Sequence, residues 1–400
     1  MYRSFFFISF FFLLWCVGCG GNGNSAPTGN NTIAGTAKNV ATLTANGGPA
    51  NVVNGLFTSV TVCSPGSTTN CATVNGILVD TGSTGLRIQA SALPSGFTLP
   101  QVNDAGGNPL AECFQFADGE TWGPVQTADV TVSGETAAKT PLQVIGVANF
   151  PGVPTGCSNL GPTEQTVAAF GANGVLGLNN NPQDCGSACA AVVNNPGVYY
   201  SCPASGCAVI AQGISQQVPN PVTLFGTDNN GVIIELPAIG ATGAPSTAGA
   251  LVFGIGTESN NGLGNATLLG TDAFGDFTAV FNGSTLNPAF LDTGSNGLFF
   301  DNTTASNLTT CSGNTSFFCP GSTVAFSATN QGVNGTVSKV NFSVANANNL
   351  FATNNAIFND LAGPNPNTLD FGLPFFFGRN VVFAISGATT PAGVGPFVGY

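Results

Sequence analysis

The chain of 400 residues contains no histidine. This absence excludes Ser-His-Asp and Cys-His nucleophilic catalysis, histidine general bases and zinc sites that need histidine ligands. Acid–base chemistry near neutral or low pH would therefore have to come from carboxylic acids.

Charged side chains are also scarce, at 6% of the residues. The chain has 18 acidic and 6 basic residues, which gives a net charge of −12. Nucleic acid and anionic membrane surfaces are poor partners for such a chain. Its polarity comes from Asn, Thr, Ser and Gly, and Val, Phe and Ile are plentiful, a mixture typical of an all-β protein with many turns. Alternating segments at 221–226, 231–236 and 249–256 predict strands.

The N-terminus, MYRSFFFISFFFLLWCVGCGG, has an apolar stretch from Phe5 to Val17. It is too short for a membrane span and is typical of an export signal. The run from Cys16 to Cys19 resembles the bacterial lipoprotein cleavage box and predicts lipidation of Cys19, with simple secretion as the alternative. We therefore expect a signal peptide at 1–19 and a flexible Gly- and Asn-rich tether at 20–40.

The cysteines agree with export. Losing Cys16 with the signal and lipidating Cys19 leaves ten of the 12 cysteines, an even number. Close spacing predicts disulfides in an oxidising compartment; the expected pairs are Cys63–Cys71, Cys202–Cys207 and Cys311–Cys319. Cys113, Cys157, Cys185 and Cys189 would form two more, and other pairings within 185–207 stay open.

A long internal repeat divides the chain. ILVDTGSTGLRI at 77–88 and AFLDTGSNGLFF at 289–300 both carry an apolar run into Asp-Thr-Gly-Ser. Each is followed by an apolar segment centred on glycine, at 172–180 and 369–385. Two copies of one plan favour two similar lobes over a solenoid, which needs more and shorter repeats. We place the lobes at 41–225 and 226–400.

The repeated loops are suited to holding a carboxylate. Glycine lets the backbone donate an N–H to the carboxylate, the serine hydroxyl can bond its outer oxygen, and the threonine can tie one loop to the other. One copy could be an ordinary turn, whereas two matched copies after apolar strands favour one shared site. The catalytic candidates are Asp80 and Asp292, and the supporting residues are Thr81, Gly82, Ser83, Thr293, Gly294 and Ser295.

Two carboxyl groups a few ångströms apart cannot both ionise freely, so they share one proton and titrate in two separated steps. The ionised member can take a proton from water, which attacks a peptide carbonyl, while the protonated member donates to the carbonyl oxygen. This chemistry requires no metal, no cofactor and no covalent intermediate.

With these motifs, most of residues 50–400 resembles the pepsin-like aspartic peptidases. VDTGSTGL and LDTGSNGL are similar to the two active-site loops of that family, and NGVLGL and DFGLPFFFGRNVVFA to its glycine-centred segments, with Gly177 and Gly372 in the glycine places. Residues 114–134 resemble the flap hairpin that closes over substrate, with Phe116 and Trp122 in it. The resemblance implies a bilobal all-β fold, two β-barrel-like lobes with an active-site cleft between them.

Three positions depart from the family pattern. Phe116 stands where the flap tyrosine is expected, so the tyrosine hydroxyl is missing, and Arg87 replaces the tryptophan after the first loop. Asp370 takes an apolar position before Gly372. We expect the Asp370 side chain to face solvent; the alternative is that Asp370 is a third carboxylate near the cleft. Arg87 could act on a dyad carboxylate or form a structural salt bridge, and Trp122 could contact substrate or cap the hairpin.

The sequence therefore predicts an exported, lipid-anchored aspartic endopeptidase of the bacterial outer membrane or periplasm. It would be a monomer that cleaves peptides or proteins at acidic pH, with a membrane contact only through Cys19. The alternative is a weak or inactive protein of the same fold that binds a peptide, polysaccharide or protein partner. A β-rich surface or adhesion protein is a third interpretation, for which the repeated loops would be mere turns.

Overall fold

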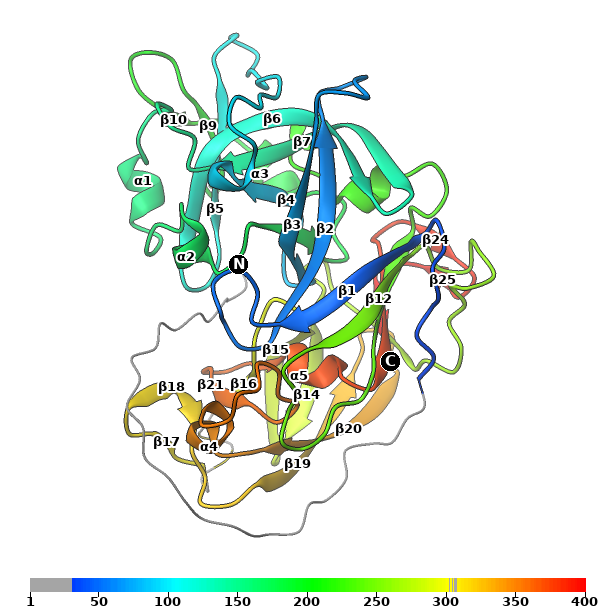
Figure 1. Ribbon diagram of the computed structural model, residues 1–400. Helices are drawn as coiled ribbons and strands as arrows, with labels where there is room; N and C mark the ends of the chain where they lie inside the picture. Colours follow the sequence, from blue (N-terminus) through cyan, green and yellow to red (C-terminus); the bar gives the residue numbers. More distant parts are fainter. Residues whose placement is uncertain (1–30, 302, 304, 306–307) are drawn as a thin grey trace.

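The computed structural model describes residues 31–400 apart from 302, 304 and 306–307 (Figure 1). The predicted signal peptide, Cys19 and residues 20–30 of the predicted tether lie outside the described residues. The described chain is built mainly of β-strands with a few short helices, which confirms the all-β prediction.

Ten strands come from the N-terminal half of the chain. In some strands, such as the second half of β2, buried and more exposed residues alternate, as the period-two sequence predicts. Other strands, such as β4, are buried along their whole length, as in a strand that is covered on both faces. The strands are Val40–Asn46 (β1), Gly55–Cys63 (β2), Cys71–Asp80 (β3), Thr84–Gln89 (β4), Leu110–Gln115 (β5), Glu120–Val132 (β6), Glu135–Ile145 (β7), Gly174–Leu178 (β8), Tyr199–Ser201 (β9) and Ala208–Val209 (β10).

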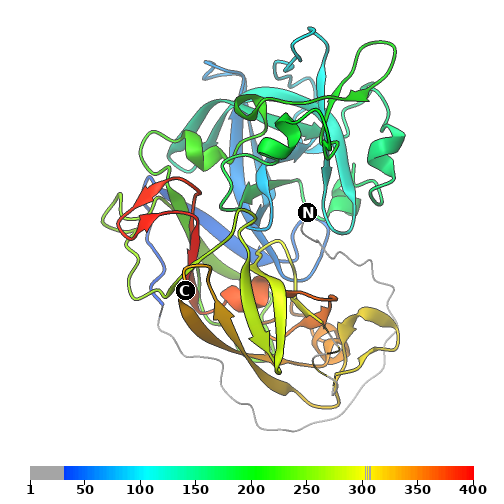
Figure 2. The same ribbon diagram turned by 180° about the vertical axis from the view of Figure 1, so that it is seen from behind.

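These strands continue into strands of the C-terminal half within one sheet, ordered β10-β9-β5-β6-β7-β4-β8-β3-β2-β1-β12-β11-β23-β26-β13. The junction is the antiparallel pair β1–β12, where Val40 faces Val252. Both views show β1 and β12 between the N-terminal strands above and the C-terminal strands below (Figures 1 and 2). The added strands are Gly231–Leu236 (β11), Thr247–Phe253 (β12), Leu268–Gly270 (β13), Arg379–Ala384 (β23) and Phe397–Gly399 (β26).

A second sheet belongs to the C-terminal half and has the order β20-β19-β14-β15-β22-β16-β21. Its strands are Phe277–Phe281 (β14), Ser284–Leu291 (β15), Leu298–Phe300 (β16), Val324–Gln331 (β19), Val337–Val344 (β20), Ala362–Pro364 (β21) and Leu369–Phe371 (β22). Two small hairpins complete the described strands: Thr310–Cys311 (β17) with Asn314–Phe318 (β18), and Thr389–Thr390 (β24) with Gly393–Val394 (β25).

The helices of the described residues are each a turn or so long: Thr155–Ser158 (α1), Val167–Phe170 (α2), Ser187–Ala190 (α3), Ala347–Phe351 (α4) and Leu373–Phe376 (α5). None of them has the length and apolar character needed to cross a membrane. The strand predicted at 221–226 is wrong, because Pro221–Leu224 forms a 3-10 turn. The Asn220 side chain caps this turn by accepting from the Val222 amide at 3.1 Å, which starts a turn where a strand was expected.

The sequence repeat is also a repeat of topology. β3 runs parallel to β8, and β8 runs antiparallel to β4, so β8 lies between the two strands that flank the first loop. In the second half, β22 lies in the same way between β15 and β16. The register places Asp80 opposite Gly177 and Leu291 opposite Phe371. Each Asp-Thr-Gly-Ser loop is therefore held against the glycine-centred segment of its own half.

Phenylalanine fills much of the core of the C-terminal half. Phe281 lies 5.1 Å from Phe300 and 5.4 Å from Phe326 between ring centroids, close enough for edge-to-face packing. Phe375 and Phe376 of α5 are buried as well, so this cluster is core. The three cysteine pairs expected from spacing are present, and the four cysteines whose pairing was left open form Cys113–Cys157 and Cys185–Cys189.

Residues 31–39, expected in the tether, belong to the folded structure. The Asn31 side chain donates to the Leu236 carbonyl at 2.7 Å, and the Ala34 amide donates to Glu235 at 2.5 Å. Ile33 and Ala37 pack on the apolar cluster beside β12. The apolar members of this Gly- and Thr-rich segment give it enough contact area to dock on β1, β11, β12 and β23, the part of the large sheet that we call the central sheet.

Candidate functional site

The two aspartates of the repeated loops meet in the interior. Asp80 is the last residue of β3, and Asp292 directly follows β15. Both are buried, with exposed fractions of 0% and 1%. The two carboxyl groups lie close enough that the charge of Asp292 raises the pKa of Asp80. The structure thus brings together two acids that lie more than two hundred positions apart in the chain.

Each carboxylate is held by its own loop in the same way. In the first loop, the Gly82 amide donates to one oxygen of the aspartate at 2.7 Å and the Ser83 hydroxyl donates to the other. In the second loop, the Gly294 amide donates at 2.8 Å and the Ser295 hydroxyl at 3.0 Å. The glycine and serine of each repeat therefore have the roles that the sequence suggests.

The threonines lock the two loops to each other. The Thr81 amide donates to the Thr293 hydroxyl at 3.1 Å, and the Thr293 amide donates to the Thr81 hydroxyl at 3.0 Å. Each hydroxyl then donates across the junction, Thr81 to the Leu291 carbonyl at 3.1 Å and Thr293 to the Val79 carbonyl at 2.7 Å. This reciprocal set of four bonds fixes the relative position of the two aspartates.

Glycine is required at three places around the pair. A Cβ atom on Gly177 would lie 2.7 Å from the Thr84 nitrogen, and one on Gly372 would lie 2.1 Å from the Gly297 carbonyl oxygen. A Cβ atom on Gly82 would lie 2.5 to 2.7 Å from the carboxyl atoms of Asp292. These glycines allow the glycine-centred strands and the opposite loop to approach the dyad closely.

The substitution Gly82→Ala tests this close approach. We expect it to destabilise the protein by about 1–3 kcal/mol, because the added methyl group would overlap the buried Asp292 carboxyl group and force it to move. Gly321→Ala is the matched control, since a Cβ atom there meets nothing within 4 Å. Thermal unfolding of both variants checks the prediction, and equal melting temperatures would contradict it.

Burial is the main cause of a strong upward shift in the pKa of Asp80, and the neighbouring charge of Asp292 adds to it. Hydrogen bonds from Ser83 and Gly82 act in the opposite direction but do not cancel the shift. The raised pKa keeps the Asp80 carboxyl group protonated to a higher pH than is usual for an aspartate.

Arg87 lies behind the first loop and forms a structural ion pair. Its guanidinium, with no exposed surface, contacts Glu112 at 2.6 Å and Asp184 at 3.4 Å. It lies 3.4 Å from the Phe114 ring centroid and donates to the Thr84 carbonyl at 2.9 Å. Of the two roles open for Arg87, the structure thus favours the structural one, and the bond to Thr84 anchors the start of β4 directly after the first loop.

Glu112, Asp184 and Tyr199 belong to the same buried network, and sequence analysis missed them. The Tyr199 hydroxyl donates to Asp184 at 2.7 Å and accepts from the Val218 amide at 2.7 Å. Burial raises the pKa of Asp184, and the nearby Glu112 carboxylate raises it further. A signal was available: acids inside apolar strands are unusual in a chain with 6% charged residues, and Glu112 lies in LAECFQ.

The flap-like segment forms a hairpin of β5 and β6 with its turn at 116–119. Phe116 is buried in that turn, and its ring lies 5.5 Å from the ring of Phe170 on α2. Trp122 is buried in β6, donates to the Pro151 carbonyl at 2.8 Å and packs edge-on against Tyr200. These contacts give Trp122 a structural role in anchoring the hairpin.

Neighbouring segments hold the same hairpin. The Glu120 amide donates to the Pro162 carbonyl at 2.9 Å, and the Glu164 amide donates to the Glu120 carbonyl at 2.8 Å. Burial, with the charges of Asp118 and Glu120, raises the pKa of the Glu164 carboxyl to about 9. The Glu120 carboxylate lies near the sulfurs of the Cys113–Cys157 disulfide. Disulfide sulfurs are not thiolates, so this group is not a metal site.

Asp370 was expected to face solvent, and this is wrong. It lies within β22 with an exposed fraction of 1%, and the register places it between Phe290 and Phe299 on the neighbouring strands. Its position on a central strand of the sheet accounts for the burial. Asp360 is also buried, and burial raises its pKa to about 6.

Comparison with known proteins assigns the chain to a family. A search of curated proteins gives no match. Residues 35–400, which include both aspartate loops, the hairpin and both sheets, match the family described as "Protein of unknown function (DUF3443)", and the chain therefore belongs to this family.

Proposed function

We propose that the protein is an aspartic endopeptidase with a two-lobed, pepsin-like fold. The observation that carries the proposal is the buried pair of Asp80 and Asp292, held side by side by reciprocal threonine bonds. The repeated topology around the two loops and the hairpin of β5 and β6 support it. The dyad alone would supply the chemistry.

In the proposed reaction, a water molecule is bound between the two carboxyl groups. Asp292 accepts a proton from this water as it attacks the peptide carbonyl, and the protonated Asp80 donates to the carbonyl oxygen of the developing gem-diol. Proton transfer to the amide nitrogen then breaks the C–N bond. The loop amides and hydroxyls around each carboxylate hold these oxygens in place, so little reorganisation is needed during the reaction.

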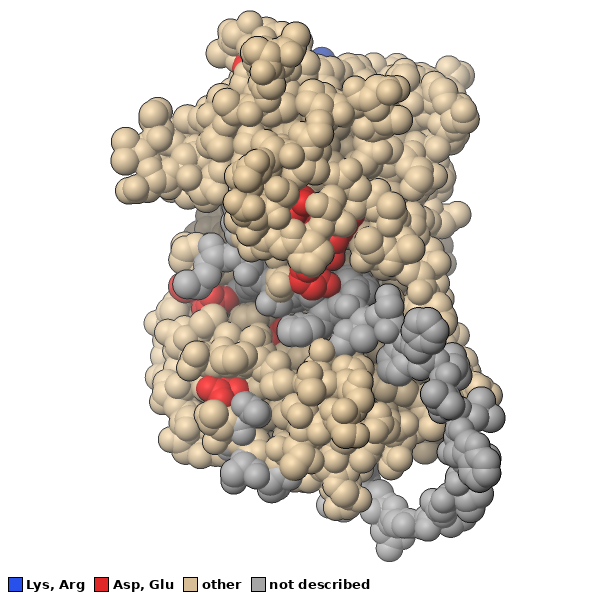
Figure 3. Space-filling view, turned by 90° about the vertical axis from the view of Figure 1, so that its left-hand side faces the viewer, with Lys and Arg blue, Asp and Glu red and all other residues tan. Residues whose placement is uncertain are grey.

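The acidic surface favours neutral or cationic substrates. In Figure 3, acidic side chains gather where the upper and lower halves of the described structure meet, and basic ones are nearly absent from this face. A polyanion would be repelled there. The substrate that we propose is an unfolded polypeptide.

We propose further that the protein is an exported monomer, anchored by a lipid on Cys19 at the outer membrane or periplasm. The five disulfides support export.

Cleavage of an unfolded protein in acid tests the proposal. We expect peptide products at about pH 3–5, where a shared-proton carboxyl pair can act both as acid and as base. The folded protein would be incubated with a reduced, denatured substrate, and products would be identified by mass spectrometry. If no new peptides form in that range with several substrates, the proposal fails.

A second function, peptide binding without efficient cleavage, is favoured by one observation. Phe116 offers no hydroxyl at the hairpin turn, and its buried ring packs on Phe170. A transition-state analogue of peptide hydrolysis distinguishes the two functions. A competent dyad binds the analogue about 10²-fold or more tighter than a matched substrate peptide, whereas a mere peptide receptor binds both alike.

A further inference from the structure

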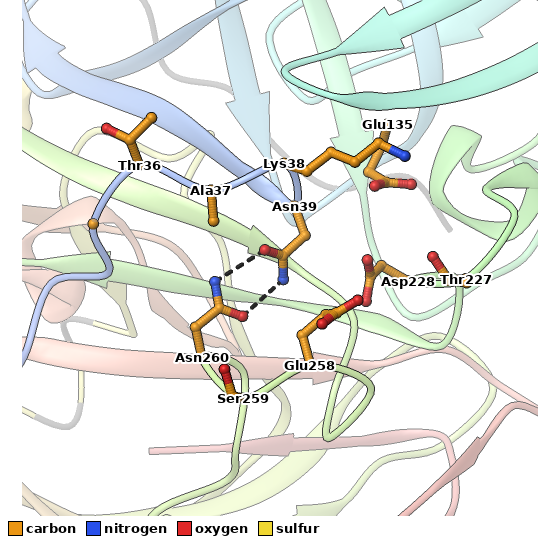
Figure 4. Close-up of a pocket in the computed structure, with 11 residues that line it drawn as sticks. Thr36, Ala37, Lys38, Asn39, Glu135, Thr227, Asp228, Glu258, Ser259 and Asn260 are labelled. Atoms are coloured by element: carbon orange, nitrogen blue, oxygen red, sulfur yellow. Dashed lines mark hydrogen bonds between the residues drawn. The ribbon is translucent and has the colours of Figure 1, made fainter.

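A pocket of about 440 Å³ lies at the junction of the central sheet with the N-terminal half. Four segments meet there: residues 35–39 before β1, Glu135 at the start of β7, the loop before β11 and the loop after β12. Figure 4 shows three carboxylates from separate segments converging on this pocket, those of Glu135, Asp228 and Glu258. Lys38 supplies one positive charge at its edge.

Two of these carboxylates are almost fully buried, which is costly without compensation. Glu135 is 5% exposed and Asp228 is 1% exposed. One Asp228 oxygen accepts from the Thr257 hydroxyl and from the Asn261 side chain. Within the described residues, no donor is bonded to the other Asp228 oxygen or to the Glu135 carboxylate, and Figure 4 shows the Glu135 carboxylate directed toward Asp228.

The charges of the pocket are not balanced by protein groups. Lys38 is exposed, and within the described residues it lies outside ion-pair distance of these carboxylates. Three carboxylates against one ammonium leave the pocket negative.

We propose that this pocket binds a divalent cation, and that Ca²⁺ is the ion it fits. Carboxylate oxygens are hard ligands, and Ca²⁺ accepts irregular sets of six to eight oxygens with water among them. The Thr227 and Ser259 hydroxyls offer further oxygens along the lining, whereas the Asn39 and Asn260 amides are bonded to each other at 3.0 and 2.9 Å. Mg²⁺ requires a near-ideal octahedron, which carboxylates on three independent segments are poorly placed to provide.

The bound ion would join the two halves of the molecule. Glu135 begins β7 in the N-terminal half, whereas Asp228 precedes β11 and Glu258 follows β12 in the central sheet. One cation contacting all three would cross-link these segments, and it would stabilise the folded state because the unfolded chain has no such site. This site is separate from the dyad and does not depend on the proposed peptidase activity.

Calorimetric titration of the chelator-treated full chain with CaCl₂ tests the site. We expect saturable binding of one Ca²⁺ per chain and a rise in melting temperature that follows the same saturation. The substitution Glu258→Gln should weaken binding about tenfold or more, because charge count sets affinity at such sites. Glu258 is exposed, so this variant should fold normally; Asp228→Asn should remove binding entirely.

The control is Asp272→Asn, which removes one exposed negative charge from a loop outside the pocket and should leave Ca²⁺ binding unchanged. NaCl at matched ionic strength should not raise the melting temperature. The proposal is overturned if neither heat nor a melting shift is seen up to about 10 mM Ca²⁺, beyond the weakest common protein sites. It is equally overturned if the Glu258→Gln variant binds as the parent does.

Discussion

The substitution Asp292→Asn is expected to lower the rate of peptide cleavage by about 10⁴-fold, the upper end of the range for a general acid–base residue. Asparagine keeps the size of the side chain but cannot accept a proton from water. Asp80→Asn should have a similar effect, because an amide cannot supply or recover the proton that the pair must share. The measurement is kcat on an unfolded polypeptide substrate at the acidic optimum.

The Asp80→Asn variant should not lose stability. Burial already raises the pKa of Asp80, so this side chain is held in its neutral form, and a neutral asparagine in its place removes a desolvation cost at high pH. At about pH 8 the Asp80→Asn variant should therefore melt at the same temperature as the parent or higher. This separates loss of chemistry from loss of folding.

Asp272→Asn serves as the control for charge, because Asp272 is exposed in a loop before β14. It should retain full activity. The dyad assignment would be abandoned if either dyad variant kept more than about a tenth of the parent rate, since such a residue would not be part of the proton transfer.

How much of this site could be predicted from sequence depends on the range of the contacts. Asp80 and Asp292 were identified because each lies in a local motif that repeats, and a repeat is visible without any knowledge of the fold. The supporting glycine and serine bonds are also local, within three residues of each aspartate. Hydrogen bonds between residues so close in the chain can be predicted from the sequence alone.

The partners of Arg87 could not be predicted in this way. Glu112 lies 25 positions away and Asp184 lies 97 positions away, on strands and loops that only the sheet order brings together. Asp370 was assigned to solvent because an acid in an apolar run is normally at an edge. The insertion of β22 between β15 and β16 places it inside the sheet instead.

The pocket carboxylates were missed for the same reason. Glu135, Asp228 and Glu258 come from three segments that carry no motif, and each alone is an ordinary acidic residue near a turn. The expectation that the chain needs no metal came from the chemistry of the dyad. It did not consider charges brought together by the central sheet, where an ion would act on stability and not on catalysis.

Stability is expected to fall as the pH rises from about 4 to about 9, which is the second large effect. The pKa of Asp360 is raised to about 6 and that of Glu164 to about 9, and those of Asp80 and Asp184 are raised as well, chiefly by burial. Between the unfolded and folded pKa values, the native state binds more protons than the unfolded chain. The free energy of unfolding therefore decreases with pH in that window.

The size of the effect follows from the shifts. Asp360 alone would account for up to about 3 kcal/mol of stability that is present in acid and lost as the pH passes 6, at about 1.4 kcal/mol per pKa unit. Asp104 and Asp301 have lowered pKa values because of hydrogen bonds from Ser201 and Thr303, and their contribution has the opposite sign. Both lie near the surface, so they oppose the trend only weakly and only below about pH 4.

Denaturant unfolding at constant ionic strength, with a chelator present to exclude any metal effect, measures the trend between pH 4 and pH 9. The variant Glu164→Gln isolates its alkaline part. Glu164 is 5% exposed, and one of its oxygens has no hydrogen-bond partner within the described residues, so a neutral amide avoids the charge that must form there above pH 9. Between pH 7 and about pH 9.5, we expect the free energy of unfolding to fall less in this variant than in the parent protein.

Asp272→Asn, at an exposed position outside the pocket, should follow the parent curve. A parent whose stability rises toward alkaline pH would show that these buried carboxyl groups are ionised in the folded protein, and the dyad would then lack the proton that its proposed chemistry requires.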